Sequence, residues 1–197
     1  MASRVYTQLA QRVLFLEVNL LPPERDDGEY SQIEVDKIKS FILLCSAEFE
    51  EYLEARLTEL NSRSQRALKR GRIPKSAASV ITHIELKRDG INKKSIIEFS
   101  IECFQHANKM IGKNHGYQQS KIEKLFKSHG FEEINAHSAL LSTLDKYGKV
   151  RGEIAHRSGL HQTNVTDPKI VKTDVSQIIS DLAILDEEIT NFARSLR

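Results

Sequence analysis

The sequence contains few of the residues that interrupt helices or cross-link a small fold. Its 197 residues include four prolines, nine glycines, two cysteines and no tryptophan. Long segments therefore run without a helix breaker, which favours helices. The two cysteines, Cys45 and Cys103, both lie in apolar patterns of helical spacing. We therefore expect two free thiols in the core of a protein from a reducing compartment, and we exclude a disulfide-based fold.

A long hydrophobic run is also missing. The most apolar stretch near the start, 13–21, is interrupted by Glu17 and Asn19 and shows no small-residue cleavage pattern. It is too short to span a bilayer. We therefore expect a soluble, cytoplasmic protein without membrane contact. The length and the charged share of 28% are typical of one globular domain, expected over 1–197.

The chain also lacks an excess of charge of one sign, because its formal net charge is only +2. No strong overall field therefore attracts nucleic acid. The basic residues are nevertheless concentrated, with six of them and no acid between residues 63 and 75. Such a run is either the solvated end of a helix and its following loop, or a contact for phosphates. The candidates for RNA binding are Arg63, Arg66, Lys69, Arg70 and Arg72.

The common motifs of catalysis and cofactor binding are absent as well. There is no glycine-rich phosphate loop, no H-E-x-x-H, no paired C-x-x-C and no G-x-S-x-G. We therefore expect neither a cofactor nor a metal ion. A metal site built from His156, His161 and Asp167 remains an alternative, although its spacing matches no standard site.

The spacing of apolar residues indicates helices along most of the chain and predicts no strand. Pro22-Pro23 ends the first helix, Ser31 and Glu34 form a capping box that opens the second, and Pro168 stands at the first position of the last. The predicted fold is all-α, an irregular antiparallel helical bundle of about six or seven helices, some of them short. The expected ranges are 4–20, 31 to about 71–74, 76–87, 95–111, 120–126, 135–157 and 168–196.

The last predicted helix carries an apolar residue at every third or fourth position from Val171 to Leu196. This seam is typical of a helix that packs inside a bundle. A contact with a second chain, as in a coiled coil, is the alternative.

Arg151 occupies an unusual place in the predicted helix 135–157. It falls between Tyr147 and Ile154 on the apolar stripe, so its side chain is expected to point toward packed surface. Burying a guanidinium is costly unless it is paired. We therefore expect Arg151 to meet a carboxylate, a phosphate or a partner chain, and Glu48 or Glu51 of the second helix are the candidate carboxylates.

Gly148, Gly152 and His156 are spaced by four residues in the same helix and so share one ridge. The two glycines either form a shallow channel that another backbone can approach, or Gly148 breaks the helix. His156 lies near the carbonyl end of this helix, which is expected to raise the pKa of its imidazole. Such a group is suited to proton transfer near neutral pH.

The segment Arg151-Gly-Glu-Ile-Ala-His156 resembles the R-x4-6-H motif of the HEPN superfamily. The motif alone occurs by chance in chains of this composition, so the resemblance depends on its context near the end of a penultimate helix. Upstream, FILLCSAEFEEYLEARL (41–57) and NHGYQQSKIEKLF (114–126) are similar to segments of prokaryotic HEPN proteins of the RiboL-PSP type. The resemblance covers most of the chain from about residue 33 onward.

The resemblance implies a homodimeric, metal-independent endoribonuclease that leaves 2′,3′-cyclic phosphate ends. It implies His156 as the general base or acid and Arg151 as the group that stabilises the phosphorane, with Glu153 and Arg157 beside them. It further implies a toxin or antiviral effector, with an antitoxin or another defence protein as partner. Gly152 departs from the family, which usually has a polar residue there. The alternatives are a non-catalytic HEPN module that binds RNA, a nucleotide or a protein, and a scaffold that uses the last helix.

Overall fold

The computed structural model describes residues 2–85, 96–113, 116, 118–156 and 167–196, with the backbone alone for 85, 96–98 and 156. These residues form seven α-helices, one short 3-10 helix and no strand, which confirms the predicted all-α fold. No helix among them is long and apolar enough to cross a membrane. The elements are α1 (Arg4–Leu20), α2 (Gln32–Lys69), α3 (Lys75–Glu85), α4 (Ile96–Gly112), α5 (Gln119–Ser128), η1 (Glu132–His137), α6 (Ser138–His156) and α7 (Pro168–Ser195).

Most helix boundaries follow from local signals in the sequence. The hydroxyl of Ser31 accepts a hydrogen bond from the Glu34 backbone, and the Glu34 carboxylate accepts one from the backbone of Ser31, as the capping box predicts. The Asp167 carboxylate caps α7 by accepting a hydrogen bond from the Lys169 backbone, with Pro168 at the first helical position. Gly130, with φ +76°, ends α5 in the left-handed region that favours glycine.

The start of α6 differs from the prediction. Residues 132–137 form η1, and the α-helix begins only at Ser138. Phe131 and Ile134 are both buried, at 1% and 0% exposure. Residues three apart lie on the same side of a 3-10 turn, so this tighter turn places both side chains in the core.

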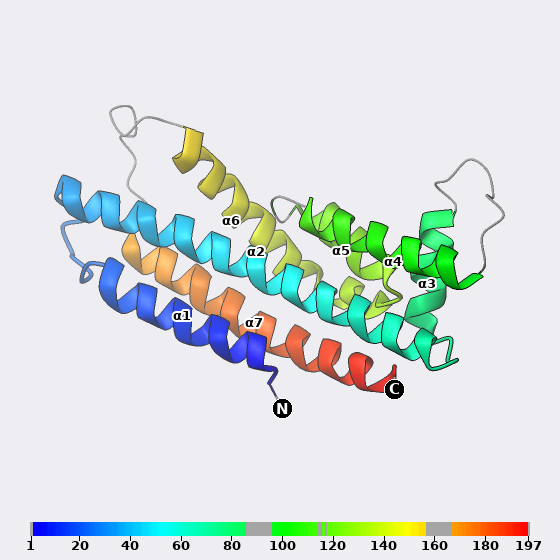
Figure 1. Cartoon of the computed structure of the whole chain (residues 1–197). Helices are drawn as coiled ribbons and strands as arrows, with labels where there is room; N and C mark the ends of the chain where they lie inside the picture. Colours follow the sequence, from blue (N-terminus) through cyan, green and yellow to red (C-terminus); the bar gives the residue numbers. More distant parts are fainter. Residues whose placement is uncertain (1, 86–95, 114–115, 117, 157–166, 197) are drawn as a thin grey trace.

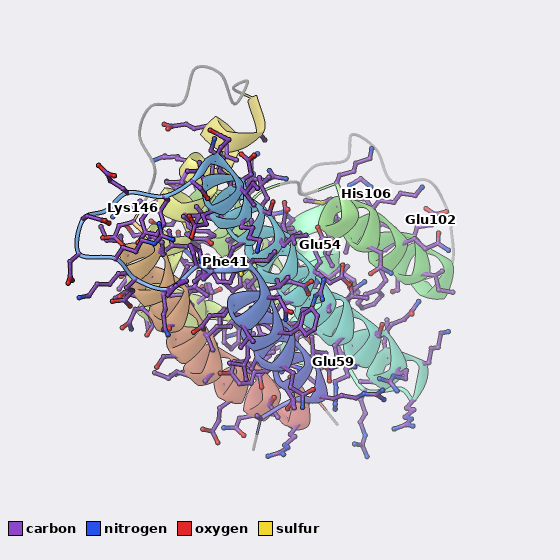
Figure 2. All side chains as sticks on the ribbon, turned by 90° about the vertical axis from the view of Figure 1, so that its left-hand side faces the viewer. Phe41, Glu54, Glu59, Glu102, His106 and Lys146 are labelled. Carbon is purple, nitrogen blue, oxygen red and sulfur yellow. The ribbon has the colours of Figure 1, made fainter. Side chains whose placement is uncertain are left out.

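The helices α1, α2 and α7 lie side by side, and α6 packs against α2 and α7 (Figure 1). α3 and α4 pack against the C-terminal half of α2, and α5 packs against α3, η1 and α6. A view along the long helices shows Phe41 inside this arrangement and Glu102 and His106 on the outward side of α4 (Figure 2). α2 therefore runs through the whole molecule and supports both groups of helices.

Two apolar clusters form the core, a large one under α1, α2, α5, α6 and α7 and a smaller one between α3 and α4. Cys45 belongs to the first and Cys103 to the second, and both are free and buried, as expected. Burial raises the pKa of the Cys45 thiol, and the nearby Glu48 adds to this, so the thiol stays protonated.

The apolar seam of α7 packs inside the bundle. Its residues from Val171 to Leu196 belong to the large cluster or pack against it, and those that are fully buried are at most 5% exposed. The interpretation as an inner face of the bundle is confirmed. The alternative, a coiled-coil contact through this seam, is wrong because the same side chains already pack against α1, α2 and α6.

A buried ion pair joins α2 to α7. Nε of Arg56 lies 3.1 Å from Oδ1 of Asp186, and the two side chains are only 1% and 0% exposed. The Tyr52 hydroxyl donates to the same carboxylate at 3.0 Å, and both the backbone N–H and the hydroxyl of Ser3 donate to it at 2.6 Å. Burial raises the pKa of Tyr52, and Asp186 raises it further, so Tyr52 remains a donor. The Asp186 carboxylate of α7 therefore binds both α2 and the start of α1.

Replacement of this carboxylate tests the network. Asp186→Ala is expected to lower the free energy of unfolding by about 3–5 kcal/mol, because Arg56 loses its fully buried partner and keeps only Glu59, which is 30% exposed, as an ion-pair partner. Urea denaturation followed by circular dichroism measures the change. Asp181→Ala on the exposed side of the same helix, where the carboxylate accepts from Gln177, is the control and should change the value by less than about 0.5 kcal/mol. Equal losses in the two variants would contradict the assigned role.

Candidate active site around Arg151

Arg151 lies in the C-terminal half of α6, at the edge of the core rather than inside it. Its side chain is 43% exposed, while Tyr147, one turn earlier, is 5% exposed. The expectation that the guanidinium points into packed surface is therefore wrong, because the apolar stripe reaches the rim of the bundle between Tyr147 and Ile154. A guanidinium at the rim can meet a ligand from solvent.

The carboxylate beside Arg151 belongs to Glu50 of α2. Oε2 of Glu50 lies 4.0 Å from Nη2 of Arg151. The prediction of Glu48 or Glu51 as the partner of Arg151 is therefore wrong, although both lie on the correct helix. Glu48 instead binds Arg12 of α1, with Oε1 3.1 Å from Nε. Each residue of an α-helix turns by about 100°, so positions 48 and 50 face nearly opposite sides of α2.

Glu50 also contacts Gly116, which lies between α4 and α5 in the chain. The backbone N–H of Gly116 donates a hydrogen bond to Oε1 of Glu50. Gly116 has φ +92°, in the left-handed region, which agrees with its place after the end of α4. The side chain of Glu50 is 20% exposed, and each of its two carboxylate oxygens has a contact, Oε1 with Gly116 and Oε2 with Arg151. One carboxylate thus brings together α2, α6 and the segment that precedes α5.

His156 is the last residue of α6, and its side chain lies outside the described residues, as do Arg157 and His161. The backbone of α6 places residue 156 about 7.5 Å along the axis and about 140° around the helix from residue 151. The two motif positions therefore do not share one face of α6. The expected rise in the pKa of His156 stays a prediction. Among the described residues, no three His, Cys, Asp or Glu side chains are arranged to hold a metal ion.

The basic run at the end of α2 lines a cavity of about 440 Å³ at the C-terminal ends of α2 and α7. Four of the five candidate RNA-binding residues line it, and Lys69 does not. No acidic side chain lines this cavity, although Glu59 binds Arg63 nearby at 2.8 Å. The lining arginines are Arg63, Arg66, Arg70 and Arg72.

Comparison with protein families matches residues 15–191 to RiboL-PSP-HEPN. The chain belongs to this family. The match extends from α1 to the last turns of α7 and includes Arg151, Glu50 and His156. No curated protein and no solved structure shows a significant match to the chain.

The HEPN motif region contains two glycines inside an unbroken helix. α6 continues through Gly148 and Gly152 to His156, so the interpretation of Gly148 as a helix break is wrong. A Cβ atom added to Gly152 would meet nothing within 4 Å. The ridge at Gly152 is therefore open in the described part of the chain, and Glu153 beside it is exposed.

Among the described residues of this HEPN chain, Arg56 is the buried arginine, and the sequence did not predict it. Two signals were present. Arg56 lies seven residues after the buried Phe49 on the apolar seam of α2, and Asp186 lies four residues after the buried Leu182 on the seam of α7. Opposite charges at seam positions of two long helices indicate a buried pair, whereas Arg151 lies near a helix end.

The open ridge permits a direct test. Gly152→Ala is expected to raise the free energy of unfolding by up to about 1 kcal/mol, because alanine is the better helix former and its methyl group has space. Urea denaturation measures the change, and Gly71→Ala is the control. Gly71 has φ +77°, so alanine there is strained and should lower stability. Loss of stability in Gly152→Ala would mean that another chain packs on this ridge.

Proposed function

We propose that this protein is a metal-independent endoribonuclease that uses Arg151 and His156. The observation that carries the proposal is the solvent-exposed guanidinium of Arg151, held beside Glu50 on the helix that ends at His156. The family match across this motif supports it. Arg151 is half-exposed and its counter-ion lies 4.0 Å away, so the guanidinium can still donate hydrogen bonds to a phosphate.

The proposed reaction is an internal transesterification of RNA. A histidine takes the proton of the ribose 2′-hydroxyl, and the 2′-oxygen attacks the adjacent phosphorus. The bond to the 5′-oxygen breaks, and a second histidine gives that oxygen a proton. The products are a 2′,3′-cyclic phosphate and a 5′-hydroxyl. Arg151 donates hydrogen bonds to the non-bridging oxygens, whose negative charge grows in the transition state.

A second copy of the chain would supply the second histidine. The motif contains one histidine, and cleavage needs both a base and an acid. We therefore propose a homodimer in which the two motifs face one groove across a twofold axis. The positions of residues 151 and 156 on different sides of α6 support this arrangement, because Arg151 of one chain can then act with His156 of the other. Glu153 and Arg157 would assist at the same groove.

The cellular role that fits this activity is a toxin or antiviral effector. We propose a single cytoplasmic domain over residues 1–197, with an antitoxin or another defence protein as its partner. Arg63, Arg66, Lys69, Arg70 and Arg72 are proposed to contact RNA phosphates, which the cavity lined by four of them supports.

Removal of the motif side chains tests the chemistry. Arg151→Ala and His156→Ala are each expected to reduce cleavage of labelled single-stranded RNA by about 10²–10⁴-fold, because each removes a group needed in the transition state. EDTA should change nothing. The matched controls are Arg12→Ala, another partly exposed arginine paired with a glutamate, and His106→Ala on the exposed side of α4. Cleavage that survives His156→Ala, or that stops with EDTA, would refute the mechanism.

Glu50 is proposed as a positioning residue for Arg151. Glu50→Gln keeps an oxygen that can accept from Gly116 but removes the charge beside the guanidinium. We expect kcat to fall about two- to fivefold with little change in KM, since a partly exposed ion pair contributes about 0.2–1 kcal/mol. Glu48→Gln, which affects Arg12 instead, is the control. Equal kcat values in the two variants would remove Glu50 from the site.

The competing function is a non-catalytic HEPN module that binds RNA, a nucleotide or a protein. Gly152 favours it, because the ridge beside Arg151 carries no side chain where relatives usually have a polar one. If the protein is such a module, the wild type and His156→Ala would bind RNA with equal affinity, and neither would release a cyclic phosphate. The assay described above for the motif variants distinguishes the two functions.

A further inference from the structure

A second basic cleft lies between α3 and α5, and it contains Lys75, the last residue of the basic run, together with two lysines that the sequence pattern did not single out. Its volume is about 590 Å³, within the range of ligand-binding sites. Lys75 begins α3, and Lys124 and Lys127 lie on one side of α5. One carboxylate, Glu123, also lines the cleft, with Oε2 3.8 Å from Nζ of Lys127. Three ammonium groups and one carboxylate leave the cleft positive.

The start of α3 packs closely on Gly130, just after the end of α5, beside this cleft. A Cβ atom on Gly130 would lie 3.0 Å from the Ser79 hydroxyl and 3.3 Å from Cα of Ser76, so the start of α3 rests closely on the end of α5. Hydroxyl groups of Ser79, Thr82 and Ser120 line the cleft beside the lysines. These groups can donate hydrogen bonds to phosphate oxygens.

A buried histidine lies behind the cleft. His129 is 1% exposed, and its Nδ1 lies 2.8 Å from the carbonyl oxygen of Leu125. Burial lowers the pKa of His129, so the ring is neutral and Nδ1 is the donor. Its Nε2 has no hydrogen-bond partner among the described atoms. His83 and Ser128 line both the cleft and the small void at His129, so this unsatisfied acceptor lies directly behind the cleft wall.

The lysine cleft lies close along the chain to the arginine cavity and to the segment beside Arg151. Arg72 lines the arginine cavity and Lys75 lines the cleft, and three residues span at most about 11 Å. At the other end, Ser120 lines the cleft and lies four residues after Gly116, at most about 14 Å away. Gly116 binds Glu50, which lies beside Arg151. α5 lies between α3 and α6 along this path (Figure 1).

We propose that the arginine cavity and the lysine cleft form a basic band that binds the phosphate backbone of a single-stranded RNA and leads toward Arg151. Lysine ammonium groups bind phosphates as point charges and read no sequence. No aromatic side chain lines either cavity, so the band supplies charge without base stacking. Its extent over two cavities favours a polymer over a free nucleotide. The inference extends the proposed function, but binding does not require cleavage.

The test measures RNA binding across salt concentrations in the His156→Ala background, with fluorescence anisotropy of a labelled single-stranded RNA. The double variant Lys124→Gln/Lys127→Gln removes two charges from the cleft. Each phosphate contact contributes about 0.7 to the slope of log K against log salt, so the slope should fall by about 1.4. Affinity near 0.15 M salt should fall about tenfold.

The control is Lys37→Gln/Lys109→Gln, which removes the same charge from exposed positions on α2 and α4. It should leave the slope unchanged, and thermal melting should show that both double variants are folded. Equal slopes in the two double variants would overturn the band. So would a cleft variant that loses binding of AMP and keeps binding of RNA. A wild type that binds RNA with the expected slopes but cuts nothing would refute the nuclease and leave the band intact.

Discussion

The buried pair of Arg56 and Asp186 determines how the long helices fit together. A charge with 0% exposure is tolerated only with full pairing, and here a guanidinium, a phenol and the start of α1 all bind one carboxylate. Alternative registers of α2 against α7 would leave Asp186 buried without a cation and would leave Arg56 with only Glu59 of its own helix as an ion-pair partner. Apolar side chains alone discriminate weakly between such registers, because leucine and isoleucine pack against many neighbours. The pair therefore selects one rotation of α2.

That rotation decides what surrounds Arg151. Glu50 precedes Arg56 by about 9 Å on the same rigid helix, so the register set at Arg56 turns Glu50 toward α6. The same rotation turns Glu48 toward α1, where it binds Arg12. Glu50 then reaches both Arg151 and the backbone of Gly116. A structural pair in the core and an exposed guanidinium at the rim are thus linked through one helix.

Net charge describes this HEPN chain poorly. Its formal value is +2, yet two neighbouring cavities contain seven basic side chains and one acidic one. Exposed charges act over about 10 Å in salt, so a phosphate near these cavities responds to the local groups and not to the total. The acidic residues lie mainly elsewhere, for example Glu48 beside Arg12. A basic surface therefore coexists with a nearly neutral chain.

The sequence by itself determined the helices, most of their ends and the position of the HEPN motif. Caps at Ser31 and Asp167 and the left-handed Gly130 act over a few residues, so local chemistry is sufficient to predict them. Only the tertiary structure decided that Arg56 is the buried arginine, that Glu50 faces Arg151, and that Lys75 joins Lys124 and Lys127. Each of these depends on the rotation of one helix against another. A heptad pattern defines which stripe is buried, but it does not define which residue of a second helix lies opposite.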